Sequence, residues 1–338
     1  MATLRDVAEK AGITVTTVSR VLNNRGYISD QTREKVYAAM RELHYRPNEV
    51  ARSLSKRRTN VIGVIVPSVM HPFFSKVVHF LEQAAAAKGY KIMLCSSNHE
   101  REKEIEYIDM LRSNKVAGIV ICSRTQDIAE HLDLGMPVVT FERELPGEIV
   151  SVSCDNYQGG AAATRHLLAC GCRRLVHISG TAGVLMAADR RGAAFADVCR
   201  AAGAEYALYH TEEAQFLSMD YGGFIRTVIE DTVLHKPAGE RADGIFASSD
   251  VIAAQVLQAC AACGVRVPEE MKLVGFDDTE IALLTTPQIT TVCQPVEDMC
   301  RYSIAYILRR LEGETVPTRT VLPVRLVVRG TTVSPENG

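Results

Sequence analysis

The sequence predicts an α/β protein built from a small all-α head and a core of two parallel-sheet lobes. Apolar residues recur at helical spacing throughout residues 1–46. From Val61 onward, short Val- and Ile-rich runs alternate with helical segments, which is typical of parallel strands covered on both faces. At about 150 residues per domain, a chain of 338 residues can hold two or three folded units, and its strand-like runs suit two sheets better than one.

The head is basic and the rest of the chain is acidic. Residues 1–60 contain 12 Lys and Arg against 6 Asp and Glu, a formal charge of +6. The whole chain has 38 Lys and Arg against 40 Asp and Glu, so the remainder carries −8. This asymmetry indicates that the head meets a polyanion while the body has another task, although small domains also vary in charge by chance.

Capping residues place three helices in the head. Thr3 followed by Asp6 is typical of a capping box, and Gly12 ends the first helix. Thr14 and Ser29 stand where N-caps of the next two helices are needed. We therefore expect helices at residues 4–11, 15–23 and 30–43.

The second of these helices presents a polar face opposite its apolar one. The apolar positions are Val18, Val21 and Leu22. The side chains on the other face can all bond phosphates or base edges, and they are Thr16, Thr17, Ser19, Arg20 and Asn23. Two short helices joined by a glycine-containing turn are typical of a helix-turn-helix, for which plain three-helix packing is the alternative.

A short segment separates the head from the core. Residues 48–55 begin with a possible cap, Asn48, but span under three turns, so this helix would fold only against a surface. The basic run Lys56–Asn60 predicts a linker.

The core pattern predicts eight strands and six of the helices between them. We expect strands at Val61–Val66, Lys91–Cys95, Val116–Ile121, Pro137–Phe141, Val150–Ser153, Arg174–Ile178, Gly244–Ala247 and Lys272–Gly275. The helices are expected at Lys76–Lys88, Glu102–Arg112, Gly160–Ala169, Arg191–Ala202, Val251–Cys263 and Val296–Leu311. Ligands of such sheets bind beyond the carboxyl ends of the strands, here in a cleft between two lobes.

Several other classes of protein are disfavoured. No apolar run reaches the roughly 18 residues of a membrane span, and no secretory signal opens the chain, so we expect a cytoplasmic protein with reduced cysteines and no membrane partner. Cys260 and Cys263, like Cys170 and Cys172, favour buried thiols over a zinc or redox site. We predict no catalytic residues, no metal and no cofactor, because no phosphate loop or nucleophile elbow is present.

Ordered motifs along nearly the whole chain resemble the LacI/GalR family of bacterial transcription regulators. In the head they are Thr3–Ile13, Thr16–Asn23 and Pro47–Leu54. In the body they are Ile62–Val64, His71–Phe74, Asp155–Asn156, Ser249–Asp250 and Val274–Asp278. The resemblance implies a periplasmic-binding-protein-like core of two doubly wound parallel-sheet lobes, acting as a homodimer or a pair of dimers. The middle of the sequence is also similar to sugar-operon repressors of Gram-positive bacteria.

The resemblance implies roles for the head. Thr16, Thr17 and Arg20 would face base edges in the major groove, since Arg is the commonest bidentate partner of guanine. Ser19 and Asn23 would bond phosphates and so position the helix.

The short segment at residues 48–55 resembles the hinge helix of the family, which orders against the minor groove. Leu54 would be the wedge that kinks the operator, and an ordinary buried leucine is the alternative. Arg52 would contact phosphate or the helix itself.

The resemblance also implies an effector site in the cleft. Phe73, Phe74 and Phe216 occupy the aromatic positions, and Arg191 with Asp277 forms a donor–acceptor pair suited to vicinal hydroxyls. A structural salt bridge is the alternative reading of that pair. Further contacts are expected from Ser68, Arg143 and Ser249.

The domains implied are a DNA-binding domain (1–46), a hinge helix and linker (47–60) and an effector-binding and dimerisation core (61–338). The first lobe would hold about 61–158 and 293–320, and the second about 159–292 and 321–338. Because no leucine-heptad tail follows Arg329, a dimer is favoured over a tetramer.

We therefore expect a ligand-controlled repressor of carbohydrate-utilisation genes, with operator DNA and a sugar or sugar phosphate as partners. A nucleobase effector is disfavoured by the apolar stretch Val184–Ala188. A solute-binding protein without a DNA role and a cytosolic α/β enzyme are the alternatives from other classes.

Overall fold

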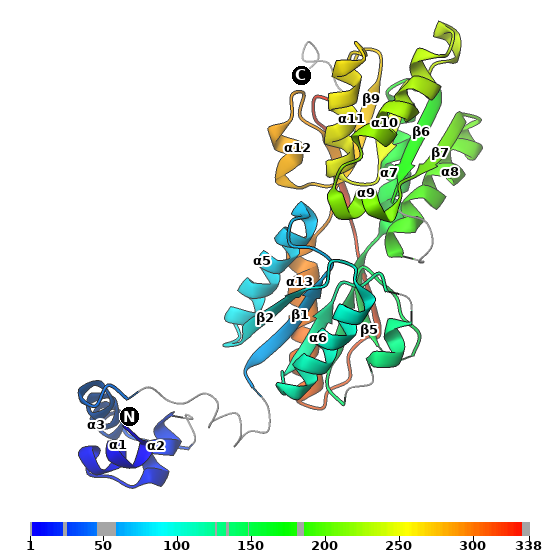
Figure 1. Cartoon of the computed structure of the whole chain (residues 1–338). Coiled ribbons are helices and arrows are strands. Elements are labelled where there is room, and N and C mark those ends of the chain that lie inside the picture. Colours follow the sequence, from blue (N-terminus) through cyan, green and yellow to red (C-terminus); the bar gives the residue numbers. More distant parts are fainter. Residues whose placement is uncertain are drawn as a thin grey trace. The chain divides into compact units, whose positions relative to one another are not determined.

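The computed structural model describes residues 2–22, 26–45, 59–125, 127–132, 135–147, 149–180 and 186–332 (Figure 1). It divides into two compact units, Met1–Thr59 and Asn60–Gly338. Asn23, Arg52, Leu54 and the expected hinge helix lie outside the described residues.

The head contains three helices, α1 (Leu4–Ala11), α2 (Val15–Leu22) and α3 (Asp30–Glu42). The expected caps are confirmed: Thr3 and Asp6 form a capping box, and Gly12 ends α1 with a φ of 67°. The side chains of Thr14 and Ser29 accept hydrogen bonds from backbone N–H groups in the first turns of α2 and α3. Local capping residues therefore determine where each of the three helices begins.

A small apolar cluster holds the three helices together. Val7 of α1, Val18 and Val21 of α2 and Val36 of α3 are all buried in it. Because Val18 and Val21 face inward, the opposite face of α2 is left toward solvent.

The first lobe is a six-stranded parallel sheet in the order β11-β5-β4-β3-β1-β2. Its strands are β1 (Val61–Val66), β2 (Lys91–Ser96), β3 (Gly118–Ile121), β4 (Val138–Phe141), β5 (Val150–Cys154) and β11 (Arg319–Leu322). Its helices are α5 (Pro72–Ala86), α6 (Arg101–Ser113) and α13 (Val296–Leu311), with a 3₁₀ turn at Ile128–His131.

The second lobe is a six-stranded sheet in the order β12-β10-β9-β8-β6-β7. Its strands are β6 (Arg174–Ser179), β7 (Glu205–His210), β8 (Gly244–Ala247), β9 (Lys272–Asp277), β10 (Thr290–Cys293) and β12 (Arg325–Val327), of which only β12 is antiparallel to its neighbour. Its α-helices are α7 (Asn156–Ala169), α8 (Arg190–Ala202), α9 (Glu213–Ser218), α10 (Gly222–Ile229), α11 (Asp250–Ala262) and α12 (Glu280–Leu284). Short turns of 3₁₀ or π type span Ala187–Asp189, Glu230–Leu234 and Ala238–Glu240.

Both faces of each sheet are covered by helices. In β1, Ile62, Val64 and Val66 pack on the side of α5 and α13, whereas Ile65 packs on the side of α6. This alternation is the two-residue period of a strand buried on both faces. The helical head and the two parallel-sheet lobes confirm the expected fold class.

Four strands were missed by the sequence reasoning. β7 is an exposed edge strand, and β11 and β12 are short, so none of the three carries a continuous apolar run. β10 reads Thr-Thr-Val-Cys, and its polarity hides the fact that Thr290 and Thr291 are fully buried.

Two helices begin earlier than expected. α5 starts at Pro72, because His71 caps it and proline is well suited to the first helical position. α7 starts at Asn156, because the Asp155 carboxylate accepts a hydrogen bond from the Gln158 N–H at 2.9 Å. In both cases the cap precedes the apolar periodicity on which the prediction relied.

Candidate functional site

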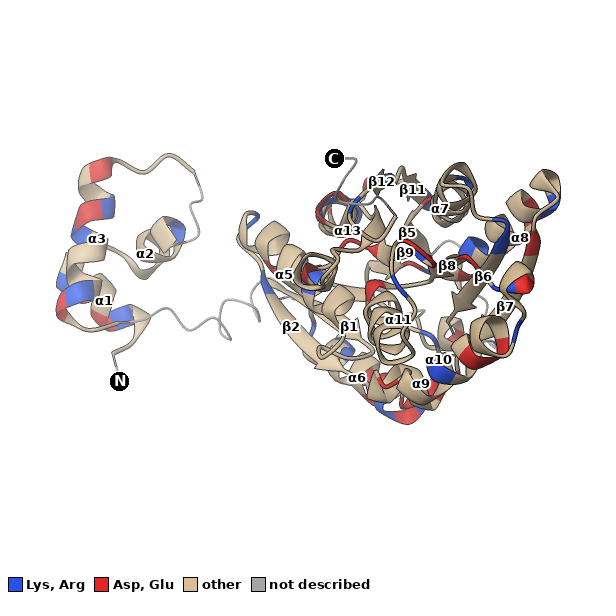
Figure 2. Cartoon of the chain, turned by 90° about the horizontal axis from the view of Figure 1, so that it is seen from above, with Lys and Arg blue, Asp and Glu red and all other residues tan. Residues whose placement is uncertain are grey.

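The outer face of α2 carries the residues expected to contact DNA. Thr16 and Arg20 are exposed, and Thr17 and Ser19 are half-buried. The Thr17 hydroxyl already bonds the hydroxyl of Thr14 at 2.9 Å. Arg20 is the only charged residue of α2, which therefore shows a single basic segment in Figure 2, whereas α1 and α3 carry both charges.

Gly26, beyond the end of α2, lies beside the side chain of Arg20. A Cβ atom placed at Gly26 would lie 2.4 Å from the Arg20 Nη2 atom, and Gly26 itself has a φ of 72°. Any larger residue here would displace the guanidinium. Beside it, Tyr27 is 95% exposed, a feature that the sequence reasoning missed and that helical periodicity could not reveal.

A cavity of about 120 Å³ lies between the two lobes of the core. Residues of both lobes line it, and most of them follow the carboxyl ends of parallel strands, where open α/β sheets bind ligands. Of the expected effector contacts, the cavity is lined by Phe73, Phe74, Arg191, Phe216, Ser249 and Asp277.

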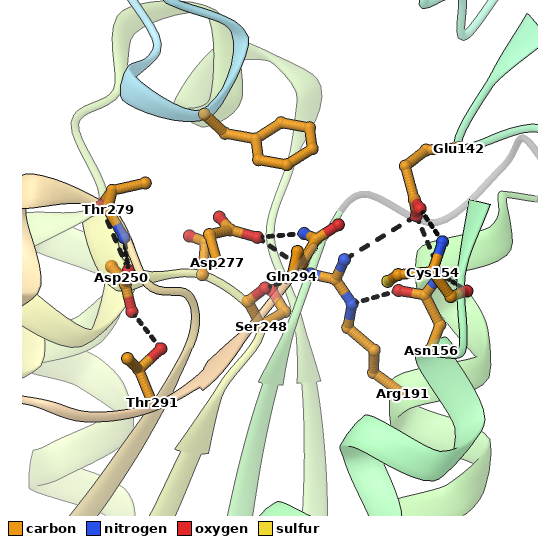
Figure 3. Close-up of polar contacts among 12 residues, drawn as sticks. Glu142, Cys154, Asn156, Arg191, Ser248, Asp250, Asp277, Thr279, Thr291 and Gln294 are labelled. Carbon is orange, nitrogen blue, oxygen red and sulfur yellow. Dashed lines mark hydrogen bonds and ion pairs between the residues drawn. The ribbon is translucent and has the colours of Figure 1, made fainter. Parts of the chain in front are cut away.

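Arg191, at the start of α8, is the centre of the cavity's polar network (Figure 3). Its Nε donates to Asn156 Oδ1 and its Nη1 to the Ser248 carbonyl, both at 2.7 Å. The guanidinium lies 3.5 Å from the centroid of the Phe276 ring. Carboxylates stand further away, with Asp277 at 3.7 Å from Nη1 and Glu142 at 4.0 Å from Nη2.

Nη2 has no hydrogen-bond partner among the residues the structure describes, since the Glu142 distance exceeds hydrogen-bond range. The Arg191 side chain is therefore fixed by its Nε and Nη1 atoms. Its Nη2 atom lies at the cavity wall, 4.0 Å from the Glu142 carboxylate.

Gly160 makes this placement possible. A Cβ atom there would lie 2.4 Å from the Arg191 carbonyl oxygen. α7 and α8 can therefore approach closely only because residue 160 has no side chain.

Asp277 ends strand β9 with a φ of 108°, in backbone geometry that favours glycine. Its Oδ1 accepts a hydrogen bond from Gln294 Nε2 at 2.7 Å. Burial raises the pKa of the Asp277 carboxyl to about 8, against the opposing effect of Arg191. The carboxyl is therefore largely protonated at neutral pH, and it can donate as well as accept.

Gln294 is a cavity residue that the sequence reasoning missed. The residue is buried, and its Oε1 atom has no hydrogen-bond partner among the described residues. A buried acceptor without a donor is costly, so this oxygen is suited to a ligand hydroxyl. Its position one residue beyond β10, a strand that was also missed, is the signal that could have identified it.

Glu142 is a second missed cavity residue. It follows β4 with a φ of 58°, and its carboxylate accepts from the Cys154 N–H at 2.6 Å and from Asn156 Nδ2 at 2.8 Å. These bonds hold the carboxylate near Arg191 without a close ion pair.

Two expected contacts, Ser68 and Arg143, are not among the residues that line the cavity. Arg143 Nη1 donates to the carbonyls of Ser123 (3.1 Å) and Thr125 (2.7 Å). It thereby holds the loop that brings Ser123 and Arg124 to the cavity wall. The Ser68 hydroxyl accepts from the Met70 N–H at 3.2 Å.

Two further residues near the cavity have structural partners. Ser249 caps α11, accepting from the Ile252 N–H at 3.3 Å. Asp250 is fully buried and accepts from the Thr279 N–H at 2.7 Å and from the Thr291 hydroxyl at 2.6 Å. Burial raises the pKa of Asp250 to about 6, and its bonds tie α11 to the start of α12 and to strand β10.

The ten cysteines are free thiols. Burial raises the pKa of the Cys260 thiol to about 12, which makes it a poor metal ligand or nucleophile. In the part of the chain that the structure describes, no helix is long and apolar enough to cross a membrane.

Comparison with known proteins agrees with this architecture. Residues 3–48 match the family described as bacterial regulatory proteins, lacI family, and residues 164–332 match the periplasmic binding protein-like domain. A helix-turn-helix head on such a core defines a ligand-binding regulator of transcription.

The most informative relatives match nearly the whole chain. A ribose operon repressor of Halalkalibacterium halodurans is 36% identical and covers 100% of this chain and 99% of its own. A sucrose operon repressor of Pediococcus pentosaceus is also 36% identical, covering 96% and 97%. The chain belongs to the lacI family and is a DNA-binding transcription regulator.

Solved structures show the same fold. The lac repressor dimer bound to operator and the anti-inducer ONPF is similar with a TM-score of 0.84 at 26% identity, over 98% of this chain and 99% of that one. A periplasmic binding protein/LacI regulator from Alkaliphilus metalliredigens, complexed with D-xylulofuranose, has a TM-score of 0.72 at 33% identity, over 82% and 100%.

Proposed function

We propose that this regulator is a cytoplasmic repressor of a carbohydrate-utilisation operon and that an uncharged sugar in the interlobe cavity controls it. The relatives named as ribose and sucrose operon repressors support the kind of operon. The observation that carries the ligand class is the set of hydrogen-bonding groups around Arg191, which faces both a protonated carboxyl and an unpartnered amide oxygen.

The cavity's charges favour an uncharged ligand over a phosphorylated one. Glu142 and Asp189 line it against two cations, Arg124 and Arg191, and the protonated Asp277 carboxyl adds no charge, so the lining has no excess of positive charge. His71 adds no charge, because burial lowers its pKa to about 4. A phosphate would bring about −1.5 to −2 charges into this setting, and burying it there without free cations is costly.

The hydrogen-bonding atoms favour hydroxyl groups. Arg191 Nη2 offers donors and Gln294 Oε1 an acceptor, and a hydroxyl can satisfy either one. The rings of Phe73, Phe74 and Phe216 supply apolar surface for the C–H faces of a sugar. A ribose- or fructose-like ligand matches this combination of groups.

On DNA, residues 1–46 would act as the reading head and residues 47–60 as hinge and linker, with residues 61–338 binding effector and forming a homodimer. Thr16, Thr17 and Arg20 would read base edges of a palindromic operator, with Ser19 and Asn23 on phosphates. Leu54 would enter the minor groove, next to Arg52.

The cleft can control this head through the hinges. Two hinge helices that order side by side need a particular spacing of the core lobes from which they emerge. A ligand that prefers one lobe arrangement therefore changes operator affinity by its differential binding.

The test is operator binding by the purified full chain, measured by gel shift on genomic fragments next to its gene. A panel of sugars, their phosphates and nucleobases is titrated into the complex. We expect at least one uncharged sugar to change operator affinity at least tenfold and its phosphate to be much weaker. Arg191→Ala should abolish the response, whereas Arg200→Ala, an exposed arginine on the same helix, should keep it. A response to a phosphate or nucleobase alone would refute the ligand class.

A further inference from the structure

Phe216 joins the two lobes across the cavity. It lies on α9, and Figure 1 shows this helix at the end of the second lobe that faces the first lobe. Its ring stacks on that of His71 in the first lobe, with centroids 5.5 Å apart and planes at 20°. The ring of His99, also in the first lobe, meets Phe216 edge-on at 4.8 Å and 88°.

His71, on which Phe216 stacks, is itself held by other residues of the cavity wall. His71 is buried and caps α5, its Nδ1 accepting from the Phe73 N–H at 3.3 Å. Its ring also lies 5.5 Å from that of Phe74. The Arg124 guanidinium also lies 5.9 Å from the Phe216 centroid. The ring is thus held by three side chains of the opposite lobe.

Phe216 therefore occupies space that a longer ligand would need. The cavity of about 120 Å³ is smaller than the roughly 300–1,000 Å³ of pockets that bury a drug-sized ligand. A disaccharide has about twice as many non-hydrogen atoms as a monosaccharide, so it needs correspondingly more space than the smaller sugar.

We propose that Phe216 is a specificity-determining lid that limits the effector to a monosaccharide. This inference rests on the proposed function, since it assumes a sugar effector. It also decides a question on which the relatives divide, because some are named for the operon of a monosaccharide and others for that of a disaccharide.

Isothermal titration of the full chain with D-ribose, D-fructose, D-glucose, sucrose and cellobiose tests the lid. The wild type should bind a monosaccharide at least tenfold more tightly than either disaccharide. Phe216→Ala should lower the ratio of the disaccharide Kd to the monosaccharide Kd at least tenfold. Leu217→Ala is the matched control, since this neighbour is 46% exposed and does not line the cavity; its ratio should match the wild type within twofold.

His99→Ala provides a second variant, because His99 packs on Phe216 without lining the cavity. It should lower the ratio of the disaccharide Kd to the monosaccharide Kd at least threefold. If Phe216→Ala does not fold, the comparison of His99→Ala with the wild type tests the lid. A wild type that binds sucrose or cellobiose as tightly as the monosaccharides overturns the lid and leaves the proposed function standing. A Phe216→Ala ratio equal to that of Leu217→Ala does the same. Absence of binding by every sugar overturns both.

Discussion

Replacing Arg191 by alanine separates a ligand-binding arginine from a purely structural one. The side chain is 7% exposed and donates two hydrogen bonds of 2.7 Å, to Asn156 and to the Ser248 carbonyl. Its removal leaves two acceptors without donors and Glu142 without its cation.

The magnitude follows from these contacts. A buried acceptor left unsatisfied costs about 1–3 kcal/mol, and the lost stacking on Phe276 adds about 1 kcal/mol. Two such acceptors and the stacking together amount to about 3–7 kcal/mol. Because water can enter the space left by the side chain, we expect Arg191→Ala to lower the free energy of unfolding by the lower end of this range, about 3 kcal/mol. Arg200→Ala should change it by no more than about 0.5 kcal/mol, because its side chain is 64% exposed.

The assay combines urea unfolding, followed by circular dichroism, with titration of the active sugar. Arg191→Lys keeps the charge but cannot reproduce the planar fork, so it should recover part of the stability and little of the sugar affinity. A loss below about 1 kcal/mol for Arg191→Ala would refute the reasoning about the network. A large loss with unchanged sugar affinity would favour the structural salt bridge.

Four further outcomes are expected. Arg20→Ala should relax discrimination at one base pair of each half-site by about 1–3 kcal/mol; uniform weakening across operator variants would make Arg20 a phosphate contact. Operator affinity should fall steeply with salt, with a log–log slope of about 0.9 per neutralised phosphate, and a salt-independent affinity would contradict the role of the basic head. The free energy of unfolding should fall between pH 6.5 and 8 by at most about 1.4 kcal/mol per pH unit, because Asp277, with its pKa raised to about 8, keeps a proton that the unfolded chain has lost; Asp277→Asn should flatten that slope, and an equal slope in both proteins would disprove the assignment. Leu54→Ala should lose most operator affinity and bending but keep sugar binding, and hydrogen exchange that shows residues 48–55 protected without operator would contradict an operator-induced hinge helix.

The pH window of the Asp277 experiment is set by the histidines. Burial lowers the pKa of His71 and His99 to about 4 and that of His177 to about 3. Between about pH 4 and pH 6.5 these histidines are protonated in the unfolded chain but not in the folded one, so the free energy of unfolding rises with pH. Above about pH 6.5 both states are unprotonated, and the contribution of the histidines is constant. The carboxyl Asp250, with a pKa near 6, has the opposite effect in the same lower range. Above pH 6.5, the pH dependence of the free energy of unfolding therefore comes mainly from the Asp277 carboxyl.

Local signals in the sequence were sufficient for much of the fold. Strand β1 and helices α1 and α13 have the bounds that the sequence predicted, because an apolar run or a cap and a glycine define them within a few residues. Strand β10 could not be predicted in this way. Its Thr291 hydroxyl is satisfied by Asp250, 41 residues away, so the polarity of the segment is explained only by the tertiary structure.

The candidate site shows the same division. Phe73, Arg191 and Asp277 were expected from family motifs, and the fold brings all three to one cavity. Gln294 was missed because the strand it follows, β10, was not predicted. Glu142 follows a strand that was predicted, but nothing in its immediate sequence shows that its carboxylate lies near Arg191. Sequence alone also could not show that Arg143 supports the loop at Ser123 instead of lining the cavity.

The cavity network includes residues at two of the places where the chain passes between lobes. Asn156 follows β5 of the first sheet and begins α7 of the second lobe. Gln294 follows β10 of the second sheet and precedes α13 of the first lobe. Arg191 holds Asn156 directly, and Gln294 is bonded to Asp277, which lies 3.7 Å from Arg191. A ligand hydroxyl that binds Gln294 Oε1 or Arg191 Nη2 therefore acts on side chains anchored at the crossovers. Any change in the angle between the lobes must be accommodated at the crossovers, so ligand binding and lobe arrangement depend on the same few hydrogen bonds. A ligand can therefore bind one lobe arrangement more tightly than another, and this difference in affinity is what control of operator binding requires.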